Sequence, residues 1–143
     1  MFKKFSFWLW MTVIFQFLTG IVHSISLFLK PVPQNDTEKQ LIGLMQSYHM
    51  GDGFGFSPTF ASLFLAVSAC FTLLCLFAGV MNIYLWKKKI PLNIMKGVMG
   101  INVIFFGVCF VLMFLFTFFL PILCTGLIFI STVAAYFTAK ERW

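Results

Sequence analysis

The chain has 143 residues, of which 61% are hydrophobic and 10% charged, and it carries a net charge of +6. Four apolar stretches of membrane-spanning length take up most of it, so no soluble catalytic domain fits in the remainder. The basic residues lie just beyond the ends of these stretches, which is typical of anchoring at a membrane surface and excludes a nucleic-acid-binding patch. The composition predicts a single transmembrane domain over residues 1–143, surrounded by membrane lipids.

The four stretches predict an all-α fold, an antiparallel four-helix transmembrane bundle. A bilayer core of about 30 Å takes about 20 apolar residues at about 1.5 Å each, and backbone groups in lipid must be satisfied inside their own helix. We expect the last two spans to be separated at Leu120-Pro121. The predicted spans are 5–29, 58–86, 91–119 and 121–139.

The first span carries polar residues on one face. Gln16, Thr19, Gly20 and His23 fall at i, i+3, i+4 and i+7, so this face should meet other helices. One interpretation of His23 is a ligand contact, a haem or metal ligand, or a proton-handling group. The favoured interpretation is a neutral imidazole that is hydrogen-bonded to another helix or to a backbone carbonyl. One histidine cannot close a metal site. The apolar run is too long for a signal peptide and lacks an A-x-A-like site, which predicts a retained span.

The polar segment 31–57 contains a predicted helix over 38–49. Thr37 and Gln40 fit a capping box, with Thr37 as the N-cap, and Gly51 follows as a stop signal. Apolar residues then recur at helical spacing, which favours a short amphipathic helix on the outer membrane surface. These residues are Leu41, Leu44, Met45 and Tyr48.

The second span should begin with Ser57 as the N-cap and Pro58 at the first helical position. Its small and weakly polar residues recur in steps of four and three, a spacing that close helix packing in lipid favours. They are Ser68, Thr72, Cys75, Gly79 and Asn82. The favoured interpretation of this stripe is a structural seam. In the alternative, Ser68 and Thr72 line an outward-opening cavity with the polar face of the first span.

In the third span, Gly97, Gly100 and Gly107 are predicted to allow close helix packing, and Lys96 can extend its amine to the membrane surface. In the fourth span the small residues Cys124, Ser131 and Ala135 are expected to pack. The four cysteines of the chain all fall inside predicted spans, where they are read as small hydrophobes.

The basic residues predict that both chain ends and the middle loop are cytoplasmic, because lysine and arginine near span ends are retained on that side. The segment 31–57 mixes acidic and basic residues and should face outward. The basic residues concerned are Lys3, Lys4, Lys87, Lys88, Lys89, Lys140 and Arg142.

Chemistry-bearing patterns are sparse. No aspartate or glutamate falls inside a predicted span, which argues against a proton-coupled multidrug transporter or a sterol-isomerase-like enzyme. His49 lies near Asp52 and within reach of Glu38, but a solvated loop histidine is favoured over a weak metal site. We therefore expect no catalytic residues, no metal and no cofactor.

Short motifs in the first 85 residues bear on family membership. They are Thr19-Gly20-Ile21-Val22-His23-Ser24, Asn35, Glu38, Leu41, Leu44-Met45, Ser57, Gly79 and Asn82. In these motifs the chain resembles a family of small uncharacterised bacterial four-helix membrane proteins, whose first span ends in a TG-x-x-H motif. Members often carry a basic and an acidic residue at the start of the second span, where this chain has Phe56-Ser57-Pro58-Thr59. A looser likeness to DoxX-type four-helix proteins rests on topology alone.

Together these features predict a non-catalytic accessory or scaffolding subunit of a larger complex in a bacterial inner membrane. Other membrane subunits or further copies of this chain are the expected partners, with no role for nucleic acid. The alternative is a small-molecule-binding or lipid-binding protein, weakly enzymatic or transporting, with an outward-facing cavity around His23. Its lining would be Gln16, Thr19, Gly20, His23, Ser68 and Thr72.

Overall fold

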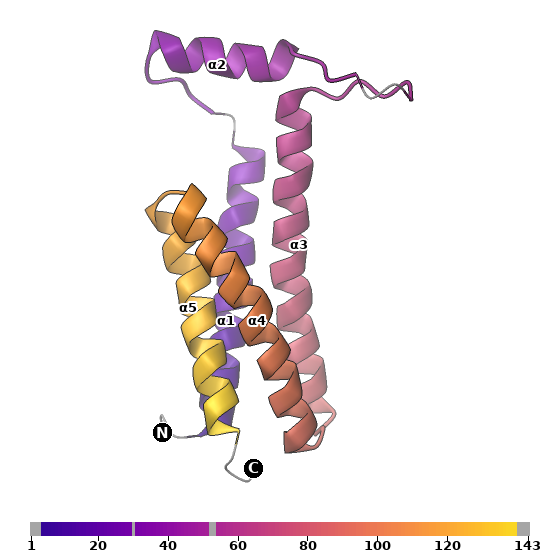
Figure 1. Cartoon of the computed structure of the whole chain (residues 1–143), viewed down its shortest axis with the longest axis vertical. Helices are drawn as coiled ribbons and strands as arrows, with labels where there is room; N and C mark the ends of the chain where they lie inside the picture. The colour runs from indigo at the N-terminus through magenta and orange to yellow at the C-terminus, as the bar shows by residue number, and fades with distance from the viewer. Residues whose placement is uncertain (1–3, 30, 52–53, 140–143) are drawn as a thin grey trace. The chain divides into compact units, whose positions relative to one another are not determined.

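The computed structural model describes residues 4–29, 31–51 and 54–139. Helix is the regular secondary structure of these residues, apart from one isolated bridge between His49 and Thr59. The helices are α1 (Phe5–Phe28), α2 (Asp36–Ser47), α3 (Phe60–Lys87), α4 (Leu92–Phe116) and α5 (Phe119–Thr138) (Figure 1). Four of them, all except α2, are long and apolar enough to cross a membrane, which confirms the predicted all-helical, multi-pass character.

The start of α2 differs from the prediction. The N-cap is Asn35, whose Oδ1 accepts a hydrogen bond from the Glu38 backbone N–H at 2.8 Å. Glu38 reaches back as in a capping box, but its Oε2 accepts from the N–H of Gln34, the residue before the N-cap, at 2.6 Å. Thr37 is therefore inside the helix and the prediction that it is the N-cap is wrong. Asparagine is the stronger N-cap residue, which explains the choice.

The start of α3 is also displaced. Thr59 is the capping residue, because its Oγ1 accepts from the Ser62 N–H at 3.1 Å, and the predicted N-cap Ser57 is wrong. Pro58 lies outside the helix, and its carbonyl accepts from the Met50 N–H at 2.9 Å. The residues before α3 are thus held by the preceding loop rather than by the helix.

The turn between the last two spans falls earlier than Leu120-Pro121. The helix α4 ends at Phe116 and α5 begins at Phe119, so the predicted break is wrong by a few residues. Pro121 lies in the first turn of α5. The N–H groups of a first turn have no partner within the helix, so proline does not interrupt it there.

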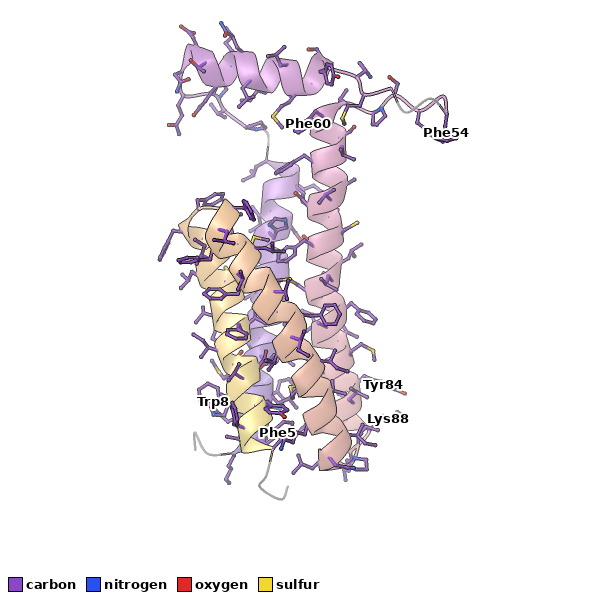
Figure 2. The ribbon with its side chains drawn as sticks, viewed as in Figure 1. Phe5, Trp8, Phe54, Phe60, Tyr84 and Lys88 are labelled. Carbon is purple, nitrogen blue, oxygen red and sulfur yellow. The ribbon has the colours of Figure 1, made fainter. Side chains whose placement is uncertain are left out.

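The chain divides into two compact units. Unit 1 comprises Met1–Gly20 and Cys75–Trp143, and unit 2 comprises Ile21–Leu74. At one end of unit 1, the beginning of α1, the α3–α4 turn and the end of α5 meet in a single apolar cluster (Figure 2). Its buried members are Phe5, Leu9, Met95, Met99, Ala135 and Ala139.

The α3–α4 turn at this end has a defined helix stop. The Lys89 N–H donates to the Trp86 carbonyl at 3.0 Å and the Ile90 N–H donates to the Leu85 carbonyl at 3.4 Å. This is a Schellman motif, and Lys89 takes its left-handed position with φ of 50°. A lysine there is strained, because left-handed backbone brings Cβ close to the following carbonyl oxygen.

The helices α4 and α5 pack through reciprocal glycine–phenylalanine contacts. A Cβ added to Gly107 would lie 3.0 Å from the Phe129 ring, and one added to Gly126 would lie 3.1 Å from the Phe110 ring. The two rings stack with centroids 5.9 Å apart. Each glycine therefore makes the space that a ring of the facing helix fills.

Unit 2 contains the end of α1, the whole of α2 and the first half of α3. Within it, α2 runs across the N-terminal end of α3 (Figure 1). Backbone bonds join the two helices: Met50 donates to Pro58, and the Phe60 N–H donates to the Tyr48 carbonyl at 3.3 Å. The segment between α2 and α3 is therefore a closed loop.

Candidate functional site

Three amide side chains connect three helices of unit 1, of which Gln16 and Asn82 are buried and Asn102 is half-buried. Asn82 of α3 donates from Nδ2 to Gln16 Oε1 at 3.0 Å, and Gln16 of α1 donates from Nε2 to Asn102 Oδ1 at 3.3 Å. Asn102 of α4 donates in turn to the Val98 carbonyl at 2.9 Å. We call this chain of hydrogen bonds the amide relay. In an apolar surrounding, such bonds favour one arrangement of the helices.

The direction of the relay is set by the backbone. The Val98 carbonyl can only accept, so Asn102 must turn Nδ2 toward it and Oδ1 toward Gln16. Gln16 must then offer Nε2 to Asn102 and Oε1 to Asn82. Asn82 Oδ1 is left buried at the end of the relay, without a hydrogen bond from the described residues. The relay thus ends in an acceptor.

A hydroxyl pair joins α1 to α5 in the same unit. Thr12 Oγ1 lies 3.2 Å from Ser131 Oγ and 3.0 Å from the Trp8 carbonyl, and its single proton serves one of them at a time. Ser131 donates to the Ile128 carbonyl at 2.9 Å. With the amide relay, this pair gives α1 polar contacts to α3, α4 and α5.

The candidate ligand residues divide between the two units. In unit 1, Gln16, Thr19 and Gly20 are buried, and Gln16 is the centre of the amide relay. The remaining candidates, His23, Ser68 and Thr72, lie in unit 2. The structure therefore assigns the polar face of α1 partly to helix packing within unit 1.

In unit 2, the His23 ring packs edge-on against Phe71, with ring centroids 5.2 Å apart. Thr72 is buried, and its Oγ1 has no hydrogen-bond partner among the described residues. Ser68 is half-buried one turn before Thr72 on α3. Two of the three residues predicted here thus come from α3 and one from α1.

The predicted packing glycines occupy different surroundings. A Cβ on Gly79 would lie 2.8 Å from the Phe17 ring, and one on Gly100 would lie 3.3 Å from the Tyr136 ring. Gly97 is exposed and has nothing within 4 Å. Gly79 and Gly100 therefore allow close contacts that Gly97 does not make.

Lysines at the cluster end of unit 1 pair with tyrosine rings. Lys96 Nζ lies 5.1 Å from the Tyr136 ring centroid, and Lys88 Nζ lies 5.7 Å from that of Tyr84. Figure 2 labels Tyr84 and Lys88 at this end, together with Phe5. Charge and aromatic rings occur together here, as at a membrane–water interface.

One exposed face of α3 in unit 2 is formed by small residues. Ser62, Ala66 and Cys70 recur every four residues, and all three are exposed. By the angle of about 100° per residue, the middle of this face lies about 120° around the helix from the buried Thr72. Small residues at this spacing let two helix backbones approach each other.

The sequence pattern did not single out Asn102, Thr12 or the buried hydroxyls of α5 apart from Ser131. Asn102 is a lone amide in an otherwise apolar run, and that isolation is the signal that could have identified it. The other overlooked residues are threonines, which bond back to their own helix and so resemble filler. They are Thr12, Thr125 and Thr132.

Among the residues that the structure describes, no three His, Cys, Asp or Glu side chains come together as a metal site requires. Comparison with known protein families, curated proteins and solved structures finds no match for this chain. The class that its helices define is a helical protein with four potential membrane spans. The resemblance to bacterial four-helix proteins stays a prediction.

Proposed function

We propose that this protein is a non-catalytic integral membrane protein that acts as an accessory or scaffolding subunit. The observation that supports it best is the amide relay, in which the buried Gln16 bonds to the buried Asn82 and to the half-buried Asn102. Polar side chains used in this way fix the positions of helices. Their chemistry is that of a packed frame rather than of a reaction centre.

We further propose an inner-membrane location in a bacterium with both chain ends in the cytoplasm. Lys4 and the Lys87–Lys89 turn belong to the end of unit 1 where α1 begins and α5 ends. Basic residues gathered at one end are retained on the cytoplasmic side. In this orientation α2 lies on the outer membrane surface, as a helix with an exposed apolar face does.

The small-residue face of α3 is the proposed contact with a partner helix, either a second copy or another membrane subunit. Lipid tails fill such a face poorly, whereas another helix packs closely against it. Ser62, Ala66 and Cys70 supply this face. Because Cys70 is exposed and Cys75 is buried, the chain carries its own cross-linking probe with an internal control.

The test is oxidative cross-linking in native membranes, followed by native mass spectrometry of the extracted protein. We expect a disulfide-linked species that forms through Cys70 and is lost in Cys70→Ser, with Cys75→Ser as the matched control. Ala66→Leu should abolish the association with the partner helix without unfolding the protein. A protein that extracts only as an uncross-linked monomer without partners would refute the subunit proposal.

One observation favours the alternative, a lipid-binding or small-molecule-binding protein. Thr72 Oγ1 is buried and has no hydrogen-bond partner among the described residues. The hydroxyl or carbonyl group of a ligand could supply that partner. Mass spectrometry of molecules that co-purify with the protein tests this. A ligand that the wild type retains and that both Thr72→Val and His23→Ala lose would support the alternative. Equal retention of the ligand by the wild type and both variants would show that these two residues do not bind it.

A further inference from the structure

We propose that the loop between α2 and α3 is a membrane-interface anchor, in which Phe54 and Phe56 insert into the outer leaflet of the bilayer that α3 crosses. The inference uses the proposed membrane-spanning role of α3 and is independent of the subunit role. The partner that this loop contacts is the lipid interface itself.

The loop is built as a fixed projection. Its two ends are joined by the Met50–Pro58 and Phe60–Tyr48 backbone bonds, at 2.9 and 3.3 Å. The His49 ring adds a third tie, with Nδ1 2.7 Å from the Ser57 carbonyl oxygen. These bonds hold the two ends at the N-terminus of α3, so the residues between them extend from one defined place.

The loop between α2 and α3 exposes two aromatic side chains. Phe54 is 88% exposed and Phe56 is 73% exposed, although phenylalanine has one of the largest apolar surfaces of any residue. Figure 2 shows Phe54 at the tip of the loop, away from the axis of α3. Two such rings, two residues apart in the chain, are apolar surface that water solvates poorly and that a binding surface covers.

The apolar side of α2 continues this surface within unit 2. Leu41 and Leu44 are more than half exposed and fall at i and i+3, on one face of the helix, and Tyr48, which follows the last residue of α2, is also more than half exposed. Because α2 crosses the end of α3, a membrane-spanning α3 places α2 parallel to the bilayer surface (Figure 1). The helix and the loop then extend from the α3 end in two directions along that surface.

The charge of residues 40–59 indicates the kind of lipid surface that the loop contacts. From Gln40 to Thr59 the only Asp, Glu, Lys or Arg is Asp52, so no basic residue attracts anionic headgroups. Binding by the two phenylalanines should therefore be apolar, and it should be the same on zwitterionic and on anionic lipid. A protein partner would need to cover the same rings at the membrane surface.

The experiment places a tryptophan at the tip of the full-length protein. Phe54→Trp is reconstituted in nanodiscs of zwitterionic phosphatidylcholine, which leave both membrane faces open to solutes. Quenching by iodide in the water and by brominated acyl chains in the lipid is measured as the difference from the wild-type signal. Gln46→Trp is the matched control, because Gln46 is exposed on the opposite face of α2 from Leu44.

We expect the tryptophan at position 54 to be shielded from iodide and quenched by brominated lipid, with the reverse at position 46. Phe56→Trp should behave as Phe54→Trp does. Iodide quenching at position 54 equal to that at position 46 would overturn the proposal, because the tip would lie in water. Shielding from both quenchers would overturn it in favour of a protein cover, and neither result bears on cross-linking through Cys70.

Discussion

Replacing Gln16 by leucine should destabilise the protein by about 2–4 kcal/mol. The change removes both interhelical bonds of the amide relay, and such bonds in membranes average about 0.6 kcal/mol each. It also leaves the buried Asn82 Nδ2 without an acceptor, at a cost of about 1–3 kcal/mol. Asn102 keeps its bond to the Val98 carbonyl and adds little.

The assay is equilibrium unfolding by SDS in mixed micelles, followed by the helical circular dichroism signal of the full-length protein. Asn82→Leu is the informative comparison. It breaks the bond to Gln16 and leaves the buried Gln16 Oε1 without a donor, but it also removes the buried Asn82 Oδ1, which has no partner among the described residues. The two effects oppose each other, so this variant should remain within about 1 kcal/mol of the wild type.

The relative stability of the two variants tests the role of the relay. If Gln16→Leu unfolds within about 0.5 kcal/mol of the wild type, the relay does not hold the helices together. If Asn82→Leu is the more damaging of the two, the assigned direction of the relay is wrong. A double variant that behaves as the sum of the single ones would show that the two amides do not interact.

Two further predictions use the same unfolding assay. Gly79→Ala should be less stable than Gly97→Ala by about 1–3 kcal/mol, because the added Cβ meets the Phe17 ring at the first position and nothing within 4 Å at the second; equal stabilities would refute the close approach at Gly79. Lys89→Gly should raise stability by about 1 kcal/mol, since glycine accepts a φ of 50° without strain. Lys88→Gly removes the same charge without that relief, so it should not stabilise, and equal gains in the two variants would contradict the strain.

The existence and approximate extent of the long helices were predictable from the sequence, because each corresponds to an apolar stretch long enough to cross a bilayer. Their ends were less so, because neighbouring residues compete for the same role. Both Asn35 and Thr37 begin a capping box, and only the relative strength of the two caps separates them. Pro121 looked like a break, yet a proline in a first helical turn is compatible with the helix.

The candidate site was predictable only in part. Gln16 and Asn82 are polar residues in apolar spans, so each was identified as inward-facing by its own helix. That they bond to each other depends on how α1 and α3 are rotated, which no local pattern specifies. Asn102 has no polar neighbour three or four residues away along α4, so only its partner on α1 reveals its role.

The reciprocal contacts between α4 and α5 have a consequence for how the protein assembles. Both helices carry Gly-x-x-Phe and run in opposite directions, so a local two-fold rotation exchanges Gly107 and Phe110 with Gly126 and Phe129. Sliding one helix by a turn would bring each ring against a side chain instead of a glycine. The hairpin of α4 and α5 therefore has one favoured register, which its own two glycines set without help from the other helices.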